Sequence, residues 1–181
     1  MFADLTFAVE VGMILAALLF IRRVSTTTTV SMVTPEYVEA GRPHILQDKP
    51  IPSNVAIFRI HGPFLFGMTD KISTITDHMD ELPPIVIVRL RNMTAIDATG
   101  IRALEDLAED LRGSGRTLIL CGALEQPAAL MRAAEFHERI GDANICKDIE
   151  TALARARALS DRGRRSTWHV ARSTSHVARG T

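Results

Sequence analysis

The segment from Pro83 to Leu107, PPIVIVRLRNMTAIDATGIRALEDL, constrains the fold of this chain more than any other part of it. Ile85–Leu90 has apolar residues at consecutive positions, which is typical of a central strand covered on both faces. A short polar loop follows, and the apolar spacing after it predicts an amphipathic helix over Asp97–Leu111. A buried strand that runs through a loop into a helix is the building unit of α/β proteins.

Other parts of the chain repeat this alternation of strand and helix. The predicted strands are Val55–Ile60, Thr117–Cys121 and a short edge strand at Asn144–Cys146, with a turn at His61–Pro63 and a short extended piece at Phe64–Phe66. The predicted helices begin at Gly67, at Pro127 (running through His137) and at Asp148 (running to Leu159). This order predicts an α/β layer with partly parallel strand pairing.

The N-terminus is strongly apolar from Leu5 to Ile21, and Glu10 is the one charge within that run. Arg22 and Arg23 end it abruptly. Because about 20 apolar residues span a bilayer, residues 1–23 are predicted to form a transmembrane helix, with Glu10 facing other helices. Basic residues favour the cytoplasmic side, so we expect a cell-membrane protein with everything after Arg23 in the cytoplasm. The alternative is a buried N-terminal helix of a soluble protein.

The chain after the apolar N-terminus divides into three regions. Residues 24–54 contain a Ser/Thr-rich stretch and several prolines and are predicted to be a linker. Residues 55–159 form the predicted globular domain. Residues 160–181 contain five Arg and one Asp and are predicted to be a disordered basic tail. Such a tail either contacts anionic membrane lipid or is a solvated extension.

Composition argues against several kinds of function. Lys and Arg together number 21, as do Asp and Glu, so net charge gives no argument for nucleic-acid binding. Cys121 and Cys146 show no metal-ligand spacing and are predicted to be reduced thiols. The chain has no Gly-rich phosphate loop of the P-loop or dinucleotide type, and no pattern that suggests a nucleophile with its base. We therefore expect no enzyme activity, no cofactor, no metal site and no nucleic-acid partner.

Three segments carry a resemblance to a known family. VIVRLRNMTAIDATGIRALEDL is similar to the central strand, switch loop and second helix of STAS domains, the fold of anti-sigma-factor antagonists. IFRIHGPFLFGMTDKI and DLTFAVEVGMILAALLFIRR resemble the start of the STAS domain and the last membrane helix of SulP-type sulfate permeases. The resemblance implies a mixed sheet of four or five strands with about four helices, packed chiefly on one side.

The resemblance also implies a function and partners. The leading hypothesis is the cytoplasmic regulatory and assembly domain of a SulP-type secondary anion transporter, with sulfate the expected anion. Its partners would be the membrane domain of the transporter, a second STAS copy, a regulatory protein and membrane lipid. Transport sites form between repeated helical halves, so the chain is expected to be a C-terminal fragment or a tethered domain and not a complete transporter. The alternatives are a phosphorylation-controlled antagonist and a small-ligand sensor.

The resemblance assigns roles to individual residues. Thr99 matches the hydroxyl residue that accepts phosphate in anti-sigma-factor antagonists, with Asp97 and Gly100 beside it. Asp and Thr are also common helix caps, so the alternative for this loop is helix initiation without modification. Phe64 and Phe66 are candidates for partner contact, and the alternative is that they close the core.

Overall fold

The computed structural model describes residues 2–32, 51–65, 72, 75–77 and 79–162. The strands in chain order are β1 (Thr29–Met32), β2 (Val55–Phe64), β3 (Ile85–Ile96), β4 (Thr117–Cys121) and β5 (Ile145–Cys146). The helices are α1 (Phe2–Thr27), α4 (Ala98–Gly113), α5 (Glu125–Ala133), α6 (Phe136–Ile140) and a helix over residues 149–162, with short 3-10 turns η1 (Met79–Glu81) and η2 (Asp142–Asn144). The expectation of an α/β fold is confirmed.

The strands form one five-stranded mixed sheet in the order β1-β2-β3-β4-β5. β1 pairs antiparallel with β2, and the other neighbours are parallel. Because β3 and β4 lie inside the sheet, both have apolar side chains on both faces, as consecutive apolar positions predict. The carboxyl ends of β2 to β5 therefore gather at one edge of the sheet.

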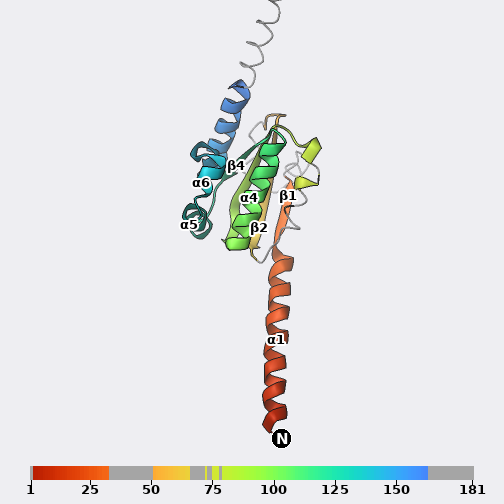
Figure 1. Ribbon diagram of the computed structural model, residues 1–181. Coiled ribbons are helices and arrows are strands. Elements are labelled where there is room, and N and C mark those ends of the chain that lie inside the picture. Colours follow the sequence, from red (N-terminus) through yellow and green to blue (C-terminus); the bar gives the residue numbers. More distant parts are fainter. Residues whose placement is uncertain (1, 33–50, 66–71, 73–74, 78, 163–181) are drawn as a thin grey trace, which may run out of the picture.

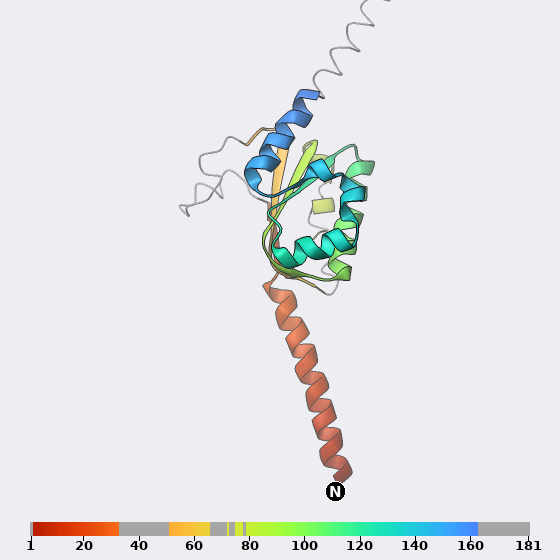
Figure 2. The ribbon, with the colours of Figure 1, turned by 90° about the vertical axis from the view of Figure 1, so that its left-hand side faces the viewer.

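Helices cover the sheet unequally. Figure 2 shows α4, α5 and α6 on one side of the sheet and the helix over residues 149–162 on the other. The larger core lies under α4, α5 and α6 and contains Phe64 and Phe136, both with 0% of their surface exposed. The smaller core lies under the last helix and contains Ile87, Cys121 and Leu153. We call these the α4 face and the opposite face.

The structure differs from the sequence-based expectation at several boundaries. β1 lies within the predicted linker, so the sheet begins before residue 55. β2 continues through the predicted turn at His61–Pro63, where shifts of register relative to β3 and a positive φ of 91° at Gly62 replace a chain reversal. The helix predicted from Pro127 is two helices, because Glu135 has a left-handed backbone with φ 53°.

β3 is also longer than predicted. It reaches Ile96, so most of the expected polar loop is strand, and only Asp97 separates it from α4. The start of the helix predicted at Gly67 and residues 163–181 of the predicted tail lie outside the described residues. Residues 160–162 belong to the last helix.

α1 leaves the sheet as an extended helix of 26 residues (Figure 1). At its end, the buried Thr28 hydroxyl donates a 2.5 Å hydrogen bond to the Pro63 carbonyl oxygen and so ties the α1–β1 junction to β2. The side chains of residues 5–20 of α1 are exposed, and many are large and apolar, including Phe7 (68% exposed) and Phe20 (66%). Among the described residues no helix reaches the length and apolarity needed to cross a membrane, so the expected transmembrane helix is not shown.

Candidate functional site

The switch loop joins the end of β3 to the start of α4, and Asp97 is its cap. The backbone of Asp97 is extended, and its carboxylate oxygen Oδ1 accepts a 2.8 Å hydrogen bond from the Gly100 N–H. Its carbonyl oxygen accepts the first helical bond, from the Ile101 N–H at 3.0 Å. A side-chain cap of this kind stabilises a helix by about 1 kcal/mol. Of the two cap candidates in the sequence, Asp97 is therefore the one that caps α4.

Gly100 allows the start of α4 to lie directly against the end of β2. A Cβ atom at this position would lie 2.7 Å from the Phe64 carbonyl oxygen, 2.7 Å from Ile96 Cγ1 and 2.8 Å from Phe64 Cδ1. The first of these is a backbone atom in a strand, which cannot move without disturbing the sheet. The glycine of the switch loop is thus required by packing, independently of any partner.

Gln126, in the first turn of α5, holds the last residue of β3 in place. Its Oε1 accepts a hydrogen bond from the Ile96 N–H at 3.0 Å, and its Nε2 donates to the Ile96 carbonyl oxygen at 2.9 Å. One side chain therefore satisfies both backbone groups of the residue before the cap. The sequence analysis missed Gln126, and no local pattern could have found it, because its partner lies 30 positions away.

Thr99 lies on the exposed side of the first turn of α4. The described part of the structure gives its hydroxyl no hydrogen bond, so the cap does not depend on it. Of the two residues considered for partner contact, Phe64 is fully buried against Gly100 and has no exposed surface. Phe66 lies outside the described residues. The loop thus brings Asp97, Gly100 and Phe64 together and leaves Thr99 facing solvent.

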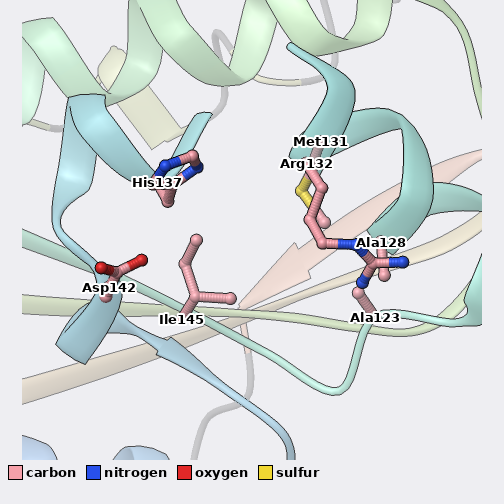
Figure 3. Close-up of a pocket in the computed structure, with 7 residues that line it drawn as sticks. All are labelled: Ala123, Ala128, Met131, Arg132, His137, Asp142 and Ile145. Carbon is pink, nitrogen blue, oxygen red and sulfur yellow. The ribbon is translucent and has the colours of Figure 1, made fainter. Parts of the chain in front are cut away.

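A pocket of about 450 Å³ lies near this site on the α4 face, between α5, α6 and β5. Figure 3 shows His137, Asp142 and Ile145 together on one side of the pocket and Arg132 on the other. The other lining residues are Ala123, Ala128 and Met131. Among these seven residues there is no Ser, Thr, Cys or Lys that His137 could activate as a nucleophile. The pocket is a mainly apolar hollow with three polar side chains, Arg132, His137 and Asp142, in its lining.

Comparison with known proteins identifies the family. The STAS domain family model matches residues 47–152, more than half of the chain. A Bacillus subtilis protein, YvdB, named as a candidate sulfate transporter, is 26% identical over 139 residues, which cover 76% of this chain and 25% of YvdB. The chain therefore spans about a quarter of the length of this curated relative.

Solved structures agree with this match. A sulfate transporter family protein from Wolinella succinogenes is 32% identical with a TM-score of 0.60, over 66% of this chain and 98% of that one. The murine anion transporter Slc26a9 superposes with a TM-score of 0.64 at 17% identity, over 84% of this chain and 26% of that one. The anti-sigma factor antagonist SpoIIAA shares the fold, with a TM-score of 0.50 at 12% identity, over 61% of this chain and 94% of that one.

The sequence match and the fold lead to the same assignment. The resemblance implied a mixed sheet, a short loop after β3 and a helix that follows it. The residues that match the family model include β2 to β5, the loop and α4, and β1 lies before them. The chain belongs to the STAS domain family, with homology to the STAS domains of SulP sulfate transporters.

Proposed function

We propose that this chain is the cytoplasmic regulatory and assembly domain of a SulP-type secondary anion transporter, with sulfate the expected anion. It acts through protein–protein contacts, and the transport site itself belongs to the membrane domain. The similarity to YvdB extends over about a quarter of that protein's length. This supports a regulatory domain that is separate from the part containing the transport site. The partners are the membrane domain, a second copy of the STAS domain and a regulatory protein at the switch loop.

The observation that carries the proposal is the apolar surface of α1. Large apolar side chains lie on every side of this helix and are more than half exposed at Leu5, Phe7 and Met13. Apolar area costs about 25 cal/mol per Å² when it is left in water, and a contiguous patch of this kind marks an interaction surface. The membrane domain of the transporter is the partner we assign to this surface.

Membrane fractionation of the full chain tests the proposal. We expect the protein in the membrane fraction, resistant to high salt and released by detergent. The double variant Ile14→Lys/Leu18→Lys should move to the soluble fraction, because both side chains are exposed on α1 and lie one turn apart. Leu124→Lys, at an exposed apolar residue outside α1, is the matched control and should stay with the membrane. Full recovery of the unmodified chain without detergent would contradict the proposal.

Co-expression with a SulP membrane domain that lacks its own STAS domain tests the regulatory part. We expect the two polypeptides to co-purify and sulfate uptake to rise above that of the membrane domain alone. The Ile14→Lys/Leu18→Lys variant should do neither. Uptake that is the same with and without the STAS chain would contradict a regulatory role.

A second candidate is a phosphorylation switch at Thr99. It is favoured by the exposed position of Thr99 at the start of α4 and by the cap that Asp97 supplies without it. A phosphate adds about −1.5 to −2 charges at pH 7, and a helix N-terminus stabilises negative charge. Mass spectrometry after incubation with cell extract and ATP tests this candidate, with Thr99→Val as the control. Stoichiometric modification elsewhere, with Thr99 untouched, would eliminate it.

A further inference from the structure

A second cavity, of about 550 Å³, opens at the carboxyl ends of β4 and β5, beside the middle of β3. Its lining includes residues on the opposite face of the sheet from the switch loop, among them Cys121 and Ile149 of the smaller core. Ligands of α/β proteins commonly bind at the carboxyl ends of parallel strands. The position of the cavity thus makes it a candidate site that is separate from the switch loop.

Arg89 is the most unusual residue in this cavity. It lies on β3, between Arg59 on β2 and Cys121 on β4, and only 8% of its surface is exposed. Within the described residues, the guanidinium group of Arg89 makes no hydrogen bond or ion pair. Buried arginines are normally paired, because a buried charge without an anion is strongly destabilising.

Among the described residues, no carboxylate is one of the groups that shift the pKa of Arg89. Burial lowers the pKa of Arg89, and the positive charges of Arg59 and Arg91 lower it further. Only Cys121 acts in the opposite direction, but burial raises the pKa of that thiol to about 12, so it is neutral at pH 7. Within the part of the chain that the structure describes, Arg89 therefore has no anionic partner.

The other charged residues of the cavity add to a net positive charge. Arg91 and Lys147 join Arg89 in the lining, and Asp148 and Glu150 are the two acidic lining residues, which gives a sum of +1. The Asp148 carboxylate is engaged at the start of the last helix, where it accepts hydrogen bonds from the Thr151 N–H at 2.8 Å and the Thr151 hydroxyl at 2.7 Å.

The backbone around the cavity also favours an anion. The N-terminus of the helix over residues 149–162 contributes to the lining, and helix N-termini carry partial positive charge. Gly122 follows β4 with φ 72° and lines the cavity beside Arg91. We propose that this cavity binds a tetrahedral oxyanion, sulfate or phosphate, held chiefly by the guanidinium group of Arg89, with Arg91 and Lys147 completing the charge.

Isothermal titration calorimetry on the full chain tests this site, which does not depend on the proposed transporter function. Sodium sulfate and sodium phosphate are titrated in a zwitterionic buffer, with sodium chloride at matched ionic strength as the control. We expect saturable binding of sulfate or phosphate, and the tighter of the two identifies the ligand. Failure of either oxyanion to bind above the chloride control would overturn the site and leave the transporter proposal untouched.

Variants locate the binding. Arg89→Met should weaken binding at least about tenfold, because a hydrogen bond to a charged group contributes about 1.5–3 kcal/mol. Lys147→Gln, at a well-exposed side chain, should weaken it less, and Arg102→Met, on the outer side of α4, should leave it unchanged. Equal affinity of Arg89→Met and the unmodified chain would overturn the assignment.

A stability measurement separates binding from a structural role for Arg89. In buffer without oxyanion, thermal unfolding of Arg89→Met should occur at the same temperature as that of the unmodified chain or higher, because removal of an uncompensated buried charge does not cost stability. Added sulfate or phosphate should then stabilise only the unmodified chain. If Arg89→Met does not fold, the binding measurement is made on Arg89→Lys and Lys147→Gln. Both should bind the oxyanion more weakly than the unmodified chain does. Unchanged affinity in these two variants would overturn the site.

Discussion

The switch loop follows the end of β3 and the Arg89 cavity lies beside the middle of the same strand, but their polar groups are satisfied in different ways. In the switch loop, hydrogen bonds from Asp97 and Gln126 satisfy the backbone on either side of the β3–α4 junction. In the cavity, Arg89 is buried without a carboxylate among the groups that set its pKa. The described residues satisfy the loop, whereas in the cavity they leave Arg89 without an anionic partner, the place that we propose an oxyanion takes.

This difference indicates what could bind to or modify each region. The switch loop can receive a partner or a phosphate on its surface without internal rearrangement, since Thr99 already faces solvent. The cavity instead gains stability when it binds an anion, because binding compensates a charge that is already buried.

Gly100→Ala should have the largest effect on the switch loop. The added Cβ would lie 2.7 Å from the Phe64 carbonyl oxygen, so β2 or α4 must shift, and the free energy of unfolding should fall by about 2–3 kcal/mol. Urea unfolding followed by circular dichroism measures this change. Gly113→Ala, at the other end of the same helix, is the matched control. A Cβ there meets no atom within 4 Å, so stability should change by less than about 1 kcal/mol. Equal effects of the two substitutions would show that the close packing at Gly100 is not required.

Gln126→Ala should have the next largest effect, because it leaves both backbone groups of Ile96 without their side-chain partner. We expect a loss of about 1–2 kcal/mol in the free energy of unfolding. The control is Glu125→Gln, at an exposed neighbour in the same turn, which should change stability by less than about 0.5 kcal/mol. If Gln126→Ala were as stable as the control, water would replace the amide side chain. The backbone groups of Ile96 would then not depend on Gln126.

The sequence predicted the parts of this fold that depend on local patterns. The apolar run at Ile85–Leu90 predicted the first half of β3, the spacing after Asp97 predicted α4, and Asp97 was one of the two cap candidates. The expected strand at Asn144–Cys146 is β5, a short edge strand. These elements follow from hydrophobic periodicity and cap chemistry, which act over a few residues.

The features that the sequence did not predict depend on contacts between distant residues. β1 lies in a Ser/Thr-rich stretch without clear alternation, and it becomes a strand only because β2 offers an edge. Arg89 stands within an apolar strand, and its neighbours on β2 and β4 are Arg59 and Cys121, neither of which is an anion at pH 7. Neither feature has a sequence signal of its own.

The pH dependence of stability shows whether the Cys121 thiol beside Arg89 is neutral in the folded protein. Its pKa is about 12 in the folded protein against 9.0 for an ordinary thiol, so the folded state keeps a proton that the unfolded state releases. This contribution to stability is fully present below pH 9 and is lost as the pH rises from 9 through 12.

The expected result is a fall of about 1 kcal/mol in the free energy of unfolding between pH 8 and 10 that Cys121→Ala does not show. Guanidinium unfolding at a series of pH values measures the free energy of unfolding of both proteins. Subtracting one profile from the other removes the contribution of the other titrating groups. Parallel pH profiles would mean that Cys121 ionises at its ordinary pKa. A thiolate would then be available beside Arg89, and the cavity would no longer lack an internal anion.

Thr99 should show the smallest effect on stability. Thr99→Val keeps the shape and branching of the side chain and removes only the hydroxyl, so the free energy of unfolding should change by less than about 0.5 kcal/mol. Thr99→Glu should be neutral or slightly stabilising, because a negative charge in the first turn interacts favourably with the helix dipole. Urea unfolding measures both variants under the same conditions as Gly100→Ala. A loss of more than about 1 kcal/mol in Thr99→Val would mean that the hydroxyl is needed for the start of α4. A neutral result leaves the hydroxyl of Thr99 free for a partner or a kinase, since Asp97, Gly100 and Gln126 hold the loop without it.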